Sequence, residues 1–262
     1  MLKTRALSAL VLAPPALAAA WFGGLWFAAL IALGCALVCW EWHGMTTRSF
    51  SLAGRIAAVA CAVAALLAVA WPLLGLAVVV AGTAASTVLT RADGTARAWA
   101  LAGAVYGGIP AVALVWLRDD TDHGRTVVFW LLLLVWATDI GAYAFGRLIG
   151  GPRLLPAVSP KKTWAGLLGG MACSAAVGWG MAASLGLAHP AALALSSGAL
   201  AVVAQVGDLI ESWVKRRWGV KDSSHIIPGH GGVLDRVDGL LAAGVAVALV
   251  LLLGGEGALG WR

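Results

Sequence analysis

Charged residues are scarce in this chain. Asp, Glu, Lys and Arg together make up 11% of its 262 residues, whereas a soluble domain carries roughly 25%. Hydrophobic residues make up 61% of the chain, and a single core in a chain of this size cannot bury so much apolar surface away from water. The composition therefore excludes an ordinary soluble globular domain and indicates that lipid surrounds most of the chain.

Cysteine is also sparse, and its placement does not suit a disulfide or zinc framework. The four cysteines, Cys35, Cys39, Cys61 and Cys173, all lie in apolar runs, and no two of them form a CxxC pair. We interpret them as small buried hydrophobic residues. The chain also shows no internal repeat and no low-complexity linker, so nothing in it indicates a repeat architecture.

In place of these features the chain has a succession of apolar segments, each near the roughly 20 residues that a membrane-spanning helix needs. We predict an all-α polytopic membrane protein with about nine transmembrane helices. The predicted spans are residues 6–22, 25–42, 56–71, 73–88, 98–117, 127–148, 164–186, 189–210 and 239–255. The first segment resembles a signal peptide, but the next apolar run follows at once, so we expect an uncleaved first helix.

The boundary at Trp71-Pro72 has two interpretations, because proline marks either a turn between two spans or a kink in one long span. Loop charge favours two spans, since Lys and Arg concentrate on the cytoplasmic side. With the N-terminus inside, nine spans leave Arg118, Arg125 and Arg262 outside and the other 15 of the 18 basic residues inside. We therefore predict a cytoplasmic N-terminus and a periplasmic C-terminus.

Two polar segments interrupt the apolar chain, and the predicted topology places both on the cytoplasmic side. They are residues 147–163 and residues 211–238. Both fall in the second of the two regions into which we divide the chain: N-terminal transmembrane helices, residues 1–125 with about five spans, and a C-terminal catalytic transmembrane region, residues 126–262. We expect the chemistry of the protein in the second region.

Carboxylates in the second polar region are paired at helical spacing. Asp208 and Glu211 lie three residues apart, and Asp235 and Asp238 repeat this spacing at the start of the last span. A charged side chain in hydrocarbon costs about 2.5–3.5 kcal/mol unless it has a partner. Several carboxylates in one cavity also repel each other unless a cation lies between them. Mg²⁺ commonly binds through one or two carboxylates together with waters and substrate phosphates.

Basic residues are interleaved with these acids. Between residues 207 and 239, five basic residues (Lys215, Arg216, Arg217, Lys221 and Arg236) balance five acidic ones (Asp208, Glu211, Asp222, Asp235 and Asp238). A polybasic lipid-binding patch would be more one-sided, so the pattern favours a metal together with phosphate. Glycines in HIIPGHGGVLDR would let backbone N–H groups approach an anion. Of its two histidines, His225 and His230, His230 either contacts phosphate or shapes the loop, and the oxygen-rich surroundings disfavour zinc.

Three further polar features each leave two interpretations. In SPKKT, Ser159, Lys161 and Lys162 bind phosphate, or the segment caps the next helix and its lysines reach the membrane surface. Asp139 lies inside a predicted span and is either functional or half of an interhelical pair. Glu41, at a span end in WEW, is either functional or an interfacial residue. We assign no role to Asp139 or Glu41.

Residues 212–238 resemble the signature of a known family. The matching positions are Ser212-Trp-Val-Lys215-Arg216, Lys221-Asp222, Ser224, Ile227-Pro228, His230-Gly231-Gly232 and Asp235-Arg236-Val-Asp238. This run is similar, without a departure, to the signature of the phosphatidate cytidylyltransferase family (CDP-diacylglycerol synthases), and GDLIES, SPKKTWAG and DIGAYAFGR extend the resemblance. It implies a multi-pass enzyme of the bacterial inner membrane that makes CDP-diacylglycerol and pyrophosphate from CTP and phosphatidate with Mg²⁺.

The resemblance also implies roles for individual residues. The expected metal ligands are Asp208 and Asp235, and the expected catalytic residues are Asp208, Asp235, Lys221, Arg236 and Asp238. The expected substrate-binding residues are Ser159, Lys161, Lys162, Ser212, Lys215, Arg216, Asp222, His230, Gly231 and Gly232. No general base is assigned, because a phosphate monoester is already ionised near neutral pH. We expect a homodimer and no nucleic-acid partner, and we leave open whether a second cation such as K⁺ acts.

Three other functions are weighed against this one. A related membrane enzyme that uses CTP on another lipid, such as a polyprenol kinase, would change the signature. A transporter would place charges at the membrane midplane between repeats, whereas here they cluster on one side. An assembly protein without activity would have lost some of the signature's acids and bases.

Overall fold

The structure, a computed structural model, describes residues 2–90, 94–119, 121 and 123–259. Arg262, which entered the topology prediction, lies outside these residues. In the described part the elements are α1 Leu2–Phe22, α2 Gly24–Thr47, α3 Leu52–Leu67, α4 Pro72–Leu89, α5 Gly94–Asp119, α6 Gly124–Leu148, β1 Arg153–Leu155, β2 Ser159–Thr163, α7 Trp164–Leu185, α8 Pro190–Arg217, α9 Leu234–Gly254 and a 3₁₀ turn, Glu256–Leu259. The described residues thus form helices, one short hairpin and the loops that connect them.

Seven of the described helices, α2 and α4 to α9, are long and apolar enough to cross a membrane. The protein is therefore a multi-pass membrane protein. Helix α3 has 16 residues, which is about 24 Å at 1.5 Å per residue, less than the roughly 30 Å of a bilayer core. The apolar part of α1 is also short, covering Leu10–Phe22. The predicted count of nine spans and the orientation of the termini stay predictions.

The helix break predicted near Trp71-Pro72 is confirmed. Helix α3 ends at Leu67 and α4 begins at Pro72. Proline suits this first helical position because the N–H it lacks would have no partner within the helix. The two segments are therefore separate helices rather than one kinked helix.

The chain forms two compact units. Unit 1 comprises Met1–Arg125 and Arg217–Val237, and unit 2 comprises Thr126–Arg216 and Asp238–Arg262. The loop between α8 and α9, residues 218–233, thus groups with the N-terminal helices. The first part of the predicted polar segment 211–238 belongs to α8, which continues to Arg217. The division of the chain into regions 1–125 and 126–262 stays a prediction.

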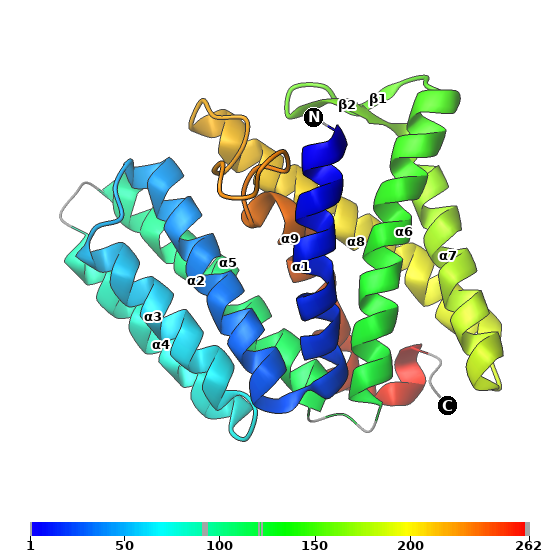
Figure 1. Cartoon of the computed structure of the whole chain (residues 1–262), viewed down its shortest axis with the longest axis horizontal. Helices are drawn as coiled ribbons and strands as arrows, with labels where there is room; N and C mark the ends of the chain where they lie inside the picture. The colour runs from blue at the N-terminus through cyan, green and yellow to red at the C-terminus, as the bar shows by residue number, and fades with distance from the viewer. Residues whose placement is uncertain (1, 91–93, 120, 122, 260–262) are drawn as a thin grey trace. The chain divides into compact units, whose positions relative to one another are not determined.

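Small residues shape the core of unit 1, in which helices α2 to α5 lie side by side (Figure 1). The buried face of α3 is made largely of alanine with Cys61, and side chains of this size let helix backbones approach closely. Cys35, Cys39 and Cys61 are buried, as predicted, whereas Cys173 in unit 2 is half-buried, and all four are free thiols. Trp42 ties α2 to α5 by donating from Nε1 to the Trp99 carbonyl at 2.8 Å.

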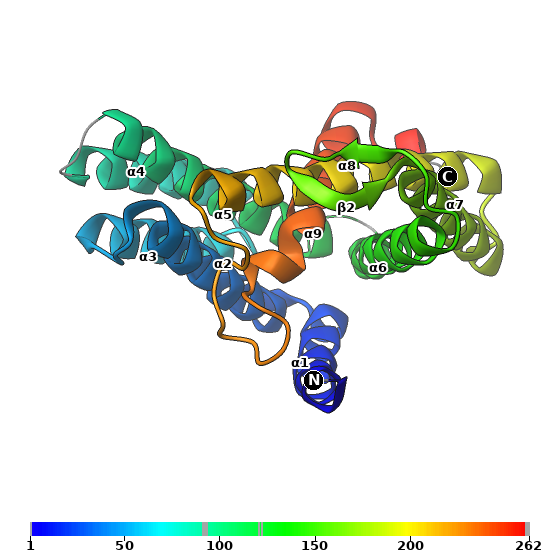
Figure 2. The same cartoon turned by 90° about the horizontal axis from the view of Figure 1, so that it is seen from above.

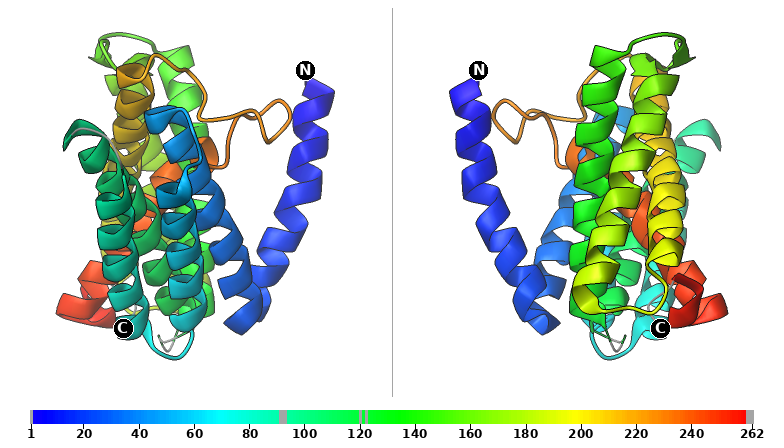
Figure 3. Two further views of the ribbon diagram at one scale, coloured as in Figure 1. Left: turned by 90° about the vertical axis from the view of Figure 1, so that its left-hand side faces the viewer. Right: turned by 90° about the vertical axis from the view of Figure 1, so that its right-hand side faces the viewer.

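Polar contacts hold the outer parts of unit 1. At the end of α5, Arg118 donates to the carbonyls of Ala20 and Trp21, both at 2.6 Å, and closes the turn between α1 and α2. Figure 3 shows the α8–α9 loop reaching towards α1, where the Ser8 hydroxyl lies 2.8 Å from Nδ1 of His230. The loop is therefore attached at its far end to the first helix.

Buried hydroxyl groups connect the helices of unit 2. Thr138 of α6 and Ser174 of α7 lie 2.7 Å apart, and Trp130 of α6 donates to Ser197 of α8 at 3.0 Å. The hairpin β1–β2 is antiparallel and lies at one end of α6 and α7, which Figure 2 shows nearly end-on. Thr163 ends β2 and caps α7, accepting from the Gly166 N–H at 3.1 Å, so the segment SPKKT does cap the next helix.

Candidate active site

A cavity in unit 2 brings residues of the predicted polar segment 147–163 next to polar residues of α6 and α8. It has a volume of about 210 Å³, and its lining includes Asp139, Lys161, Lys162, Gln205 and Asp208. The Lys162 ammonium lies 2.7 Å from Asp208 Oδ2, and the two side chains are 17% and 32% exposed. Lys162 is thus held in a partly sheltered ion pair with Asp208. Asp139, to which we assigned no role, lines the same cavity.

Three carboxylates form a cluster in unit 2. One oxygen each from Asp208, Glu211 and Asp238 lies within 4.8 Å of the others. Glu211 is 1% exposed, and its carboxylate lies 2.6 Å from the Lys215 ammonium. With Lys162 on Asp208 as well, the three carboxylates, when all are ionised, outnumber the two ammonium groups by one negative charge. Hard oxygen ligands with residual negative charge suit a divalent cation such as Mg²⁺.

Close packing of α8 against α9 creates this cluster. A Cβ atom at Gly207 would lie 2.7 Å from both the Asp238 carbonyl oxygen and Ala242 Cβ. Glycine at this position therefore lets the two backbones approach. The neighbouring Asp208 and Asp238 carboxylates meet as a result. Sequence reasoning paired Asp208 with Glu211 but did not include Glu211 among the site residues.

A second carboxylate network lies in unit 1. Asp235 Oδ2 accepts hydrogen bonds from the Ser223 N–H at 3.0 Å, the Ser223 hydroxyl at 2.8 Å and the Gly232 N–H at 2.8 Å. These donors all belong to the α8–α9 loop. Asp235 thus holds the loop against the first turn of α9.

Glu41 of α2 is the other centre of this network. Its carboxylate accepts from the Ser224 hydroxyl at 2.6 Å and from the Val233 and Leu234 N–H groups at 2.8 and 2.7 Å. The Ser223 hydroxyl lies 3.2 Å from the same carboxylate. Glu41 is 1% exposed. The only sequence signal for it was a carboxylate in an otherwise apolar helix.

In the glycine-rich part of the α8–α9 loop, backbone N–H groups donate hydrogen bonds to other groups of unit 1. The His230 and Gly231 N–H groups donate to the Ile227 carbonyl, the Gly232 N–H to Asp235, and the Val233 N–H to Glu41. These donors are therefore engaged within unit 1. The predicted contacts of Gly231, Gly232 and His230 with substrate stay predictions.

The remaining predicted residues are divided between the units. In unit 2, Ser159 begins β2, Ser212 donates to Asp208 at 3.3 Å, and Arg216 is exposed near the end of α8. In unit 1, Lys221, Asp222 and Arg236 are exposed. Asp208 and Asp235, the predicted metal ligands, belong to different units, and a shared metal stays a prediction.

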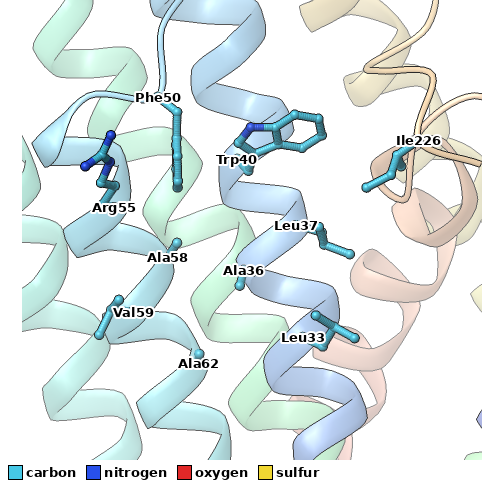
Figure 4. A pocket seen from close by; sticks show the side chains of 10 residues that line it. All are labelled: Leu33, Ala36, Leu37, Trp40, Phe50, Arg55, Ala58, Val59, Ala62 and Ile226. Atoms are coloured by element: carbon cyan, nitrogen blue, oxygen red, sulfur yellow. The ribbon is translucent and has the colours of Figure 1, made fainter.

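An apolar groove also lies in unit 1, with a volume of about 590 Å³. It runs between α2 and α3, with Arg55 and Phe50 towards one end and Ile226 of the α8–α9 loop at its side (Figure 4). Because its walls are almost wholly hydrocarbon, we expect lipid chains to fill it in a membrane.

The structure as a whole is that of a membrane protein with a sheltered set of carboxylates and lysines, a set suited to phosphate and a divalent cation. The chain belongs to the cytidylyltransferase family, whose model matches residues 3–253. A phosphatidate cytidylyltransferase of Brucella suis is 40% identical over 257 residues, which cover 97% of this chain and 93% of the relative. A phosphatidate cytidylyltransferase of Pseudomonas aeruginosa is 38% identical over 270 residues, which cover 98% of this chain and 100% of the relative. One of Staphylococcus epidermidis is 41% identical over 145 residues, 55% of each chain.

The close contacts at Gly232 lead to a prediction about stability. An added Cβ would overlap with Ser223 Oγ and Glu41 Oε1, so Gly232→Ala should destabilise unit 1 by about 1–3 kcal/mol. The matched control is Gly44→Ala in α2, where a Cβ would meet nothing within 4 Å. Thermal unfolding of the purified proteins in detergent, followed by tryptophan fluorescence, measures both. Equal melting temperatures for the two variants would contradict the prediction.

Proposed function

We infer that this protein is a phosphatidate cytidylyltransferase. It transfers the cytidylyl group of CTP to phosphatidate and releases pyrophosphate. A phosphate oxygen of phosphatidate forms a new bond to the α-phosphorus of CTP, and the bond between that phosphorus and the β-phosphate oxygen breaks. CDP-diacylglycerol is the lipid product, and the pyrophosphate carries away the electron pair of the broken bond.

The observation that carries this proposal is the ion pair of Lys162 with Asp208, in a cavity beside the carboxylate cluster. Family membership supports the same reaction, because relatives that match nearly the whole chain bear this name. The cavity, at about 210 Å³, is smaller than the roughly 300 Å³ or more that a whole drug-sized ligand occupies. We therefore propose that it receives part of a substrate, such as a phosphate group.

The chain's own residues address the main barrier, which is the approach of two anions. Lys161 and Lys162 bring positive charge to the cavity, and Lys215 keeps Glu211 neutralised. Fixed positive groups stabilise charge that builds up on transferring phosphates, and little covalent work is left for the protein. Lys221, Arg216 and Arg236, all exposed, are proposed to bind phosphate oxygens. No side chain is needed as a general base.

The carboxylate cluster fits Mg²⁺, which when bound would neutralise phosphate oxygens and stabilise the leaving pyrophosphate. Asp208, Glu211 and Asp238 would hold it. The sequence also predicted Asp235 as a ligand, but its hydrogen bonds with Ser223 and Gly232 favour a role in holding the α8–α9 loop. We propose the bacterial inner membrane as the location, with the cluster facing the cytoplasm, where CTP is available. The homodimer stays a prediction that the mass of the purified protein in detergent would test.

The test is turnover by the purified protein in detergent micelles with Mg²⁺, CTP and phosphatidate. The expected product is CDP-diacylglycerol, identified by mass spectrometry, with pyrophosphate in equal amount. Parallel reactions contain a polyprenol or diacylglycerol in place of phosphatidate. Folded protein that modifies one of these lipids and leaves phosphatidate unchanged would overturn the proposal.

A further inference from the structure

The carboxylate of Glu41 connects α2 to the α8–α9 loop and the start of α9, which are far from α2 in the sequence. It comes from the last third of helix α2 and accepts hydrogen bonds from groups 182 to 193 residues further along the chain. A buried carboxylate is costly unless hydrogen bonds satisfy it. Here the Val233 and Leu234 N–H groups and two serine hydroxyls supply them.

Two of the four donors are the N–H groups at the start of α9. The first N–H groups of a helix have no partner within it, and the helix dipole places partial positive charge there. Glu41 therefore acts as the cap of α9 from a different helix. The first turn of α9 carries the signature residue Asp235, so the cap sets where this turn begins.

Ser223 extends this connection from Glu41 to Asp235. Its hydroxyl lies 3.2 Å from Glu41 Oε2 and 2.8 Å from Asp235 Oδ2, and its single proton is shared between the two carboxylates. The Ser223 N–H also donates to Asp235 at 3.0 Å. A change in the Glu41 carboxylate would thus be passed to the orientation of Asp235.

We propose that Glu41 is a positioning residue of the enzyme: through Ser223, Ser224 and the start of α9 it holds the α8–α9 loop and Asp235 in the arrangement that the reaction needs. The effect on catalysis rests on the proposed function, whereas the effect on the loop does not. Glu41 itself does not contact substrate. This role differs from the interfacial position that the sequence left open for it.

The test compares Glu41→Gln with Asp119→Asn. Asp119 is a matched control because it is also a sheltered carboxylate of unit 1 that accepts a backbone N–H at a helix start, that of Gly24 at 2.9 Å. The Gln side chain can accept at one oxygen, but its amide group would face the N–H donors of Val233 or Leu234. We expect faster hydrogen exchange across residues 221–236 in Glu41→Gln, with no change there in Asp119→Asn.

Turnover provides the second readout. We expect kcat of Glu41→Gln to fall by about 10- to 100-fold, the scale of a small misplacement of reacting groups, with KM for CTP little changed. Ser224→Ala removes the 2.6 Å bond to Glu41 and the local bond that the Ile226 N–H donates to the Ser224 hydroxyl, and it leaves the other donors of Glu41 in place. It should give a smaller fall in the same direction, so the proposal does not depend on one variant. Glu41→Asp, which keeps the charge, should retain more activity than Glu41→Gln.

The proposal would be overturned if residues 221–236 of Glu41→Gln exchanged hydrogen at the same rate as those of the wild type. It would also be overturned if kcat fell as far in Asp119→Asn as in Glu41→Gln, because a general loss of stability would then explain the effect. Wild-type protein that makes no CDP-diacylglycerol would overturn the proposed function instead, and hydrogen exchange would still test whether Glu41 holds the loop.

Discussion

Asp208→Asn is expected to reduce CDP-diacylglycerol formation by at least about 100-fold, the scale seen when an electrostatic or ligand-supporting group is removed from an active site. Asp208 pairs with Lys162 at 2.7 Å and belongs to the cluster with Glu211 and Asp238. The amide keeps the size of the side chain and removes its charge. The loss should therefore appear in kcat, measured with purified protein at saturating CTP and phosphatidate.

Two comparisons separate this effect from a loss of folding. Asp119→Asn removes a sheltered carboxylate that takes no part in the cluster of unit 2, and its kcat should stay within a few-fold of the wild type. Lys162→Met tests the ion pair, because groups that act as a unit give non-additive losses. The double variant Asp208→Asn, Lys162→Met should be little worse than the poorer single variant. More than a tenth of wild-type kcat in Asp208→Asn would contradict the assignment.

The helices of this protein were predictable from the sequence because long runs of apolar residues mark them. Apolar runs in a lipid solvent have to satisfy their own backbone groups, and a helix does so within one segment. The break before Pro72 was predictable for a local reason, since proline fits the first turn of a helix and not its interior. The length of α3 was harder to foresee, because its 16 residues are followed by the apolar residues Ala68 to Trp71, which read as part of the same span.

The site was only partly predictable, for a related reason. Asp208 and Glu211 share a helix face by their spacing, and the structure keeps them together in the cluster. Asp235 and Asp238 have the same spacing, but Asp235 bonds to Ser223 and Gly232 whereas Asp238 joins Asp208 and Glu211. Spacing predicts which residues are neighbours on one helix. The groups that other segments bring close decide which hydrogen-bond network or cluster each carboxylate joins.

The glycines of the α8–α9 loop illustrate the same limit. Their pattern indicates backbone N–H groups near an anion, and the structure does place anions there. These anions are the carboxylates of Glu41 and Asp235. Glu41 is distant in sequence and belongs to a segment whose composition indicates only a membrane span, so no local pattern could identify it as the partner.

Removal of the divalent cation is expected to abolish turnover, and Mg²⁺ should restore it. Asp208, Glu211, Asp238, Lys162 and Lys215 together carry one net negative charge, which a cation would balance. Asp238→Asn should therefore raise the Mg²⁺ concentration needed for half-maximal turnover by about 10- to 100-fold. The measurement is the initial rate of CDP-diacylglycerol formation in Mg²⁺ titrations after treatment with EDTA.

Asp235→Asn in the same titration decides between the two arrangements of ligands. If Asp235 binds the cation, Asp235→Asn should raise the Mg²⁺ requirement as far as Asp238→Asn does. If Asp235 instead holds Ser223 and Gly232, Asp235→Asn should lower kcat and leave the Mg²⁺ requirement near that of the wild type. Because Asp235 Oδ2 already accepts three hydrogen bonds in unit 1, we expect the second result. Full activity of the EDTA-treated wild type, without added metal, would contradict the cation site itself, because turnover would then need no cation at the carboxylate cluster of unit 2.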